Sequence, residues 1–64
     1  MSFHSQSQLD DMSVSELVSA IKSSAREVDQ RMNNAYDALA YADDILSLTN
    51  ELRDRIEGYL EDEE

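Results

Sequence analysis

A chain of 64 residues with no cysteine, no proline and a single glycine forms at most one small domain, which no disulfide or thiolate metal site can reinforce. Its net charge of −10 is concentrated in the second half: five acids and three bases precede Asn33, and ten acids and two bases follow it. Such a surface repels nucleic acid and anionic membrane, so we expect no direct nucleic-acid binding and no membrane contact.

Residues 1–12 are rich in serine and glutamine and have no periodic apolar positions. We interpret them as a flexible Ser/Gln-rich tail. No basic, apolar run resembling a signal peptide occurs there, and no apolar stretch approaches the roughly 20 residues of a membrane span. The expected location is the cytoplasm, or the host cytoplasm if the protein is viral.

The first helix signal comes directly after this tail. Ser13 and Glu16 have the spacing of a capping box, in which each side chain accepts a hydrogen bond from the backbone of the other residue. Met12 before the cap and Leu17 after it fit the hydrophobic staple that often accompanies the box. Both patterns predict that a helix begins at Val14.

From Val14 onward, apolar residues recur with heptad spacing. When Val14 is placed at position d, twelve of the fourteen a and d positions up to Leu60 are apolar, and Thr49 and Arg53 are the other two. The f positions on the opposite side, from Glu16 to Glu51, are all polar. This pattern predicts an all-α fold in which residues 13–60 form an amphipathic coiled-coil region.

The number of helices in this region is left open by Asn33 and Asn34. Asparagine is a poor helix former that tolerates turn conformations, and Asn34 with Asp37 makes a weak capping pattern. The heptad positions run through the pair without a shift. The pattern therefore favours one long continuous helix, with a helical hairpin that turns at 33–34 as the alternative.

Both alternatives leave an apolar stripe in water unless the chain associates. We expect a homo-oligomer, most simply a coiled-coil dimer, which in the hairpin form is a four-helix bundle. From Ala38 onward the g positions are apolar as well, which widens the face. The predicted oligomer interface consists of Val14, Leu17, Val18, Ile21, Ala25, Val28, Met32, Ala35, Leu39, Ala42, Ile45, Leu46, Leu52, Ile56, Tyr59 and Leu60.

The end of the chain is strongly acidic. Gly58 offers a left-handed C-terminal cap, and the four acids at 61–64 oppose the helix dipole. We predict that 61–64 form a disordered acidic tail.

The residues that catalysis and cofactor binding need are missing. The only histidine, His4, lies in the predicted tail, no cysteine is present, and one glycine cannot build a phosphate-binding loop. The acidic pairs lack the spacing of a calcium-binding loop. We therefore expect a protein that is not an enzyme, with no catalytic residues, no cofactor and no metal site.

The acidic second half suggests a binding surface. In a dimer its acids recur about once per 2.2 Å of helix, against about 1.7 Å for the phosphates of duplex DNA. We predict that the protein binds, and inhibits, a partner with a basic surface, a strategy similar in physical type to that of small viral inhibitors that imitate DNA. The alternative is a structural or adaptor coiled-coil subunit of a larger assembly. The predicted contact residues are Asp37, Tyr41, Asp43, Asp44, Glu51 and Asp54.

Overall fold

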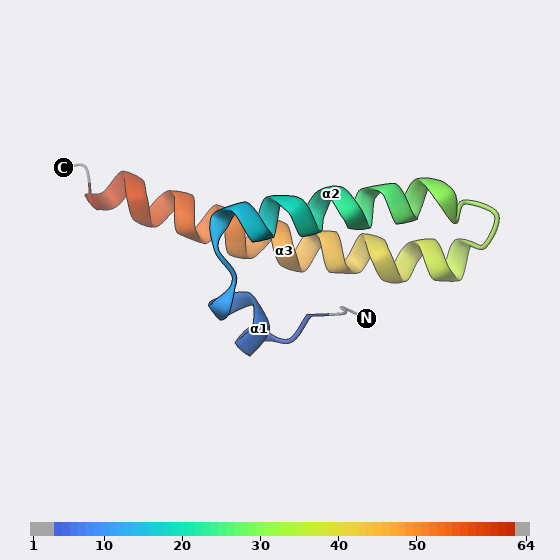
Figure 1. Cartoon of the computed structure of the whole chain (residues 1–64), viewed down its shortest axis with the longest axis horizontal. Coiled ribbons are helices and arrows are strands. Elements are labelled where there is room, and N and C mark those ends of the chain that lie inside the picture. Colours follow the sequence, from blue (N-terminus) through green and yellow to red (C-terminus); the bar gives the residue numbers. More distant parts are fainter. Residues whose placement is uncertain (1–3, 63–64) are drawn as a thin grey trace.

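The computed structural model describes residues 4–62, and this part of the chain contains helices and no strand. The helices are α1 (Gln6–Asp11), α2 (Val14–Gln30) and α3 (Ala35–Asp62). Helices α2 and α3 lie side by side as an antiparallel hairpin, α1 packs against this pair, and the C-terminal part of α3 extends past the beginning of α2 (Figure 1). The prediction of an all-α fold is confirmed.

The start of α2 is set by the capping box. The Ser13 hydroxyl accepts from the Glu16 N–H at 3.1 Å, and the Glu16 carboxylate accepts from the Ser13 N–H at 3.0 Å. The backbone N–H of Ser13, and secondarily its side chain, lower the pKa of Glu16 because both stabilise the charged carboxylate. The predicted start at Val14 is confirmed.

The chain turns between α2 and α3. The Asn34 N–H donates to the Arg31 carbonyl at 2.9 Å, and the Asn34 side-chain oxygen accepts from the Asp37 N–H at 3.4 Å at the start of α3. The continuous helix that the heptad phase favours is therefore wrong, and the alternative, a hairpin, is correct. A straight helix has no interior, whereas the hairpin removes Leu17 and Leu48 fully from water.

The core of the molecule is a small leucine cluster where the three helices meet. Leu9 of α1, Leu17 of α2 and Leu48 of α3 are buried together. Burial of each such side chain contributes about 1.5–3 kcal/mol. The side chains packed around this cluster are Met12, Ala20, Ile21 and Leu52.

Helix α1 lies in the segment that the composition assigns to a flexible tail. The Ser5 hydroxyl accepts from the Gln8 N–H at 3.3 Å, and the Gln8 side chain accepts from the Ser5 N–H at 2.8 Å, so a second capping box starts this helix. Leu9 then fixes α1 in the core. The prediction for 1–12 is wrong for the helix, and residues 1–3 lie outside the described part of the chain.

The end of α3 also differs from the expectation. The helix continues through Gly58 to Asp62, and Gly58 keeps a negative φ rather than the left-handed conformation that ends many helices. Residues 61 and 62 are thus helical where a disordered tail is predicted. The last two acids of that tail, Glu63 and Glu64, lie outside the described residues.

Helix α3 carries two apolar stripes, each with alternating steps of three and four residues. The inner stripe is buried or half-buried against the rest of the hairpin and consists of Ala38, Tyr41, Ile45, Leu48 and Leu52. The outer stripe is mostly exposed and consists of Ala35, Leu39, Ala42, Leu46, Thr49, Arg53, Ile56 and Leu60. A single helix α2 can cover only one of them.

Leu46 and Leu48, two residues apart and therefore on different sides of α3, test which side of this helix faces α2. We expect Leu48→Ala to cost about 2–5 kcal/mol of unfolding free energy because it empties a buried site. Leu46→Ala removes an exposed side chain from the same helix and should change the free energy by no more than about 0.5 kcal/mol. Urea unfolding in the dilute limit, where the midpoint no longer depends on protein concentration, measures both. Equal losses would mean that α3 faces α2 with another side.

Candidate functional site

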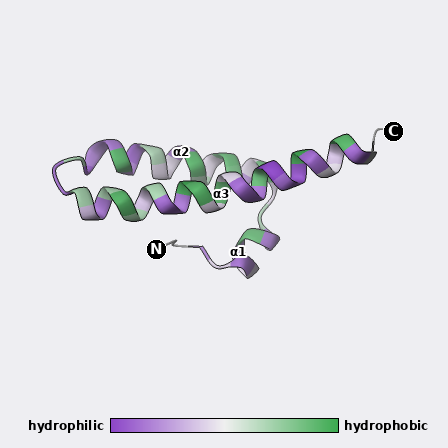
Figure 2. Ribbon diagram, turned by 180° about the vertical axis from the view of Figure 1, so that it is seen from behind, coloured by the Kyte–Doolittle hydropathy of each residue, from purple (hydrophilic) through white to green (hydrophobic). Residues whose placement is uncertain are grey.

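Several large apolar side chains along α3 are exposed to solvent. Leu39, Leu46, Ile56 and Leu60, here called the α3 ridge, are 58%, 63%, 48% and 61% exposed. Apolar segments recur along α3 from the turn to the C-terminal end (Figure 2). Met32 and Tyr36 near the turn, and Tyr59 near the C-terminal end, are also exposed. The hairpin therefore leaves an apolar surface along the length of its longest helix.

The structure divides the sixteen predicted interface residues into two equal sets. Eight are buried or half-buried in the folded chain: Val14, Leu17, Val18, Ile21, Val28, Ala42, Ile45 and Leu52. The other eight are exposed: Ala25, Met32, Ala35, Leu39, Leu46, Ile56, Tyr59 and Leu60. The first set lies mainly within the fold of one chain, although the half-buried Ala42 belongs to the outer stripe, and the second set is exposed to contact with another chain.

Leu48 and Ser24 are buried but absent from the predicted interface. Leu48 lies at a c position of the heptad frame and Ser24 at a g position. The signal that could have identified Leu48 is the inner stripe, whose spacing is as regular as that of the outer one. Two equally regular stripes predict a helix with two apolar sides, and the heptad frame followed only one.

Asp44 is not part of an exposed acidic surface. Its side chain is buried in the hairpin, with a residue exposure of 1%. One carboxylate oxygen accepts from the Ser24 hydroxyl of α2 at 3.1 Å, and the other lies 2.8 Å from His4 Nδ1. The prediction of Asp44 as a contact residue is therefore wrong, because these hydrogen bonds compensate its burial and tie the segment before α1 to both long helices.

Tyr41 and Glu51 also make contacts within the chain. The Arg31 guanidinium lies 5.1 Å from the centre of the Tyr41 ring, a cation–π contact that packs the turn against α3. The neighbouring Tyr41 and Glu27 side chains raise the pKa of Arg31. Glu51 is half-buried and pairs with Arg55 at 3.2 Å. The predicted contact residues Tyr41 and Glu51 are thus both half-buried and engaged within the chain.

Arg55 holds the end of α1 in place. Its guanidinium donates to the carbonyls of Leu9 at 2.7 Å and Asp10 at 3.3 Å, and also to that of Met12. The last carbonyls of a helix have no hydrogen-bond donor within the helix, and they form the negative end of its dipole. The Arg55 guanidinium supplies the missing donors and places a positive charge at this negative end. The Glu51 carboxylate completes the arrangement and keeps the guanidinium oriented.

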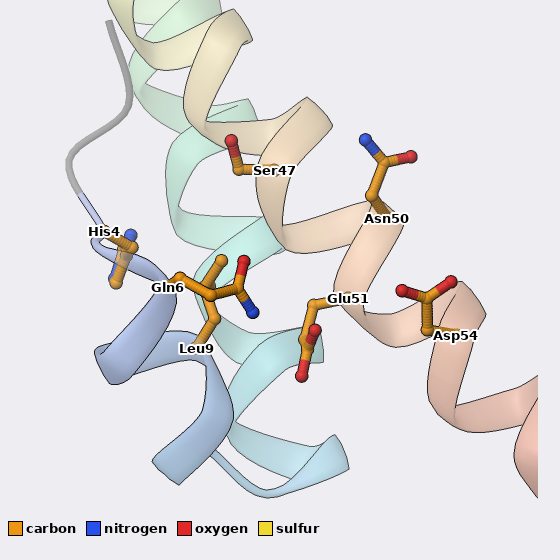
Figure 3. A pocket seen from close by; sticks show the side chains of 7 residues that line it. All are labelled: His4, Gln6, Leu9, Ser47, Asn50, Glu51 and Asp54. Carbon is orange, nitrogen blue, oxygen red and sulfur yellow. The ribbon is translucent and has the colours of Figure 1, made fainter.

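The remaining predicted acids lie on the surface. Asp37 and Asp54 are exposed, and Asp43 is half-buried. Asp54 borders a groove of about 260 Å³ between α1 and α3 (Figure 3). The groove is lined by His4, Gln6, Leu9, Ser47, Asn50, Glu51 and Asp54. Five of these seven side chains carry oxygen atoms and two of the five are acidic, which suits a cationic group better than an anion.

Between residues 4 and 62, no group of three or more histidine, cysteine, aspartate or glutamate side chains is placed to hold a metal ion. None of the described helices is long and apolar enough to span a membrane. The chain matches no protein-family model, and no curated protein or solved structure is found to be similar to it. Function has to be inferred from the surfaces of the hairpin itself.

Two aspartates of α3 separate structural from surface acids. We expect Asp44→Ala to cost about 1–3 kcal/mol, because it leaves the buried Ser24 hydroxyl without its acceptor. Asp54→Ala removes the same charge from an exposed site and should change the unfolding free energy by no more than about 0.5 kcal/mol. Thermal or urea unfolding followed by circular dichroism measures both. An Asp44 variant as stable as the Asp54 variant would contradict the role assigned to this carboxylate.

Proposed function

We propose that this chain is a non-enzymatic interaction protein of the cytoplasm. Two hairpins associate through their α3 ridges, and the acidic side of α3 remains available to a basic partner protein. The observation that carries the proposal is the exposure of four large apolar side chains in one row on α3. The proposal combines the expected homo-oligomer with the expected acidic binding surface. It rests mainly on the apolar row and only secondarily on the acidic surface.

The free energy available from the α3 ridge supports association. Each square ångström of apolar surface removed from water contributes about 25 cal/mol. The ridge side chains are about half to two-thirds exposed, and the nearby Met32, Tyr36 and Tyr59 are exposed as well. Extended exposed apolar surface on a soluble domain is typical of protein contact sites. Within residues 4–62 only four apolar side chains, those of Leu9, Leu17, Ala38 and Leu48, are buried, so a second copy would add substantially to the stability of the hairpin.

The net charge opposes this association. Each chain carries −10, so a dimer concentrates −20 in a small volume. Ions screen such repulsion over a Debye length of about 10 Å at 0.1 M salt. Self-association through the ridge should therefore strengthen as salt is added, whereas the binding of a basic partner should weaken.

The groove beside α1 gives the acidic surface a specific place for partner binding. Asp54 is exposed at its rim, Glu51 forms part of its wall, and the Gln6 and Asn50 side chains supply further oxygen acceptors (Figure 3). A lysine or arginine side chain could donate to several of these oxygens at once. We assign the basic contact to this groove rather than to the whole of the predicted acidic face, because Asp44 and Tyr41 are already engaged within the chain.

Self-association is tested by changing one ridge residue. We expect the wild-type chain to scatter light as a species of twice 7.3 kDa at submillimolar concentration, and Leu46→Gln to remain a monomer there. Ser23→Gln on the exposed side of α2 is the matched control and should dimerise normally. Circular dichroism checks that all three chains keep their helices. A wild-type protein that stays monomeric at the highest soluble concentration would refute the association.

The groove is tested with a lysine-rich peptide as the probe. Asp54→Asn should weaken its binding about two- to fivefold, the range expected for a partly screened ion pair. Asp37→Asn lowers the charge equally but lies far from the groove, and it should have a smaller effect. Calorimetric titration at low and high salt measures both. Equal losses would assign the binding to the net charge of the surface and not to the groove.

A further inference from the structure

We infer that the two copies pair through antiparallel α3 helices in one particular register. In this register the residue numbers of facing positions add up to 95, so that Leu39 faces Ile56 of the second copy and Ala35 faces its Leu60. The inference rests on the proposed self-association and adds to it a direction, a register and the residues that meet. The observations that support it are the order of residues along the outer stripe, the exposure of α3 and the position of Arg53.

Side-chain size along the outer stripe fits this register. In an antiparallel pair of heptad helices, each a position faces a d position of the other helix. Leu60 then faces Ala35, Arg53 faces Ala42 and Leu46 faces Thr49, so three of the four layers combine a large with a small side chain. A parallel pair would place leucine against leucine and alanine against alanine, which packs less evenly.

Arg53 provides the charge argument. It interrupts the apolar row, and its side chain is 74% exposed and pairs with Glu57 of its own helix at 3.1 Å. In a parallel dimer the two Arg53 side chains would face each other at the centre of the interface, where like charges repel and are costly to desolvate. In the antiparallel register each Arg53 lies across from Ala42 and within reach of Asp43 of the second copy. The two-fold symmetry makes this ion pair twice.

The length of α3 selects this register among the antiparallel ones. A shift by one heptad in either direction leaves either Leu39 or both Ile56 and Leu60 without a facing position within the helix. In the register proposed here, the first and the last residues of the outer stripe, Ala35 and Leu60, face each other, so all four ridge residues are covered.

The free end of α3 fits the same arrangement. The C-terminal part of α3 extends past the beginning of α2, at the end of the molecule opposite the turn (Figure 1). Ile56 and Leu60 are exposed there, and Met32 and Tyr36 are exposed at the turn end. Antiparallel pairing places each extension along the turn end of the other copy, so that both exposed ends become covered. Parallel pairing would leave the two extensions beside each other, where both are acidic.

Disulfide trapping tests the pairing, because the chain has no cysteine of its own. Ala42→Cys and Arg53→Cys are made as separate full-length chains and oxidised in a glutathione buffer, alone and after mixing. We expect a disulfide between the two different chains in the mixture and little cross-linking of either chain alone. Position 42 faces position 53 of the other copy, whereas two copies of either position lie eleven residues, about 16 Å, apart along the helix pair. Ser23→Cys on α2 is the control and should remain uncross-linked. Electrophoresis without reductant and mass spectrometry identify the products.

The outcomes separate this inference from the proposed function. If sedimentation shows dimers but each single variant cross-links to itself, the helices are parallel and the inference is wrong while the self-association stands. If the wild-type chain is a monomer throughout, both are wrong.

Exchanging the charges at positions 53 and 43 tests the proposed register independently. Arg53→Glu should raise the dimer dissociation constant about tenfold, and adding Asp43→Arg in the same chain should restore much of the affinity. No recovery in the double variant would contradict the facing of Arg53 and Asp43.

Discussion

Helix α3 has two apolar sides, and one chain supplies only one helix long enough to cover one of them. This imbalance underlies the rest of the structure. The inner stripe packs on α2 and, with Leu9 of α1, makes a three-leucine core. The outer stripe keeps its large side chains in water. A domain of this length already buries a smaller fraction of its surface than a larger one, so an unburied stripe is a considerable share of its possible stability.

Polar contacts help the small apolar core to hold the three helices in their relative positions. Asp44 connects α3 to α2 through Ser24 and to the N-terminal segment through His4, and Arg55 binds the carbonyl end of α1. Contacts of this kind fix the relative position of the helices, because a buried polar group that is separated from its partner carries an unfavourable desolvation free energy. Helix α1, only six residues long, depends on these contacts and on Leu9 for its place.

The same contacts determine which acids are available to another molecule. A high negative charge suggests a uniformly acidic surface, yet one aspartate is buried and one glutamate pairs with an arginine inside the fold. Of the predicted contact acids, Asp54 at the rim of the groove and Asp37 near the turn remain exposed, and Asp43 is half-buried. In the proposed dimer the ridge and the acidic side are neighbouring sides of one helix, so association and partner binding can coexist.

The sequence by itself determined the helical class, the start of α2 and much of the apolar residue set, because these depend on hydrogen bonds and spacings within a few residues. Ser13 with Glu16 is such a signal, and Ser5 with Gln8 was equally readable but lay in a segment whose composition suggested a tail. Only the tertiary structure decided that the chain turns at 31–34, that the stripe with Leu48 faces inward while that with Leu46 faces out, and that Asp44 is buried. Two stripes of equal regularity satisfy the same local rules, and the choice between them depends on contacts between residues far apart in the chain, such as Leu17 with Leu48 and Ser24 with Asp44.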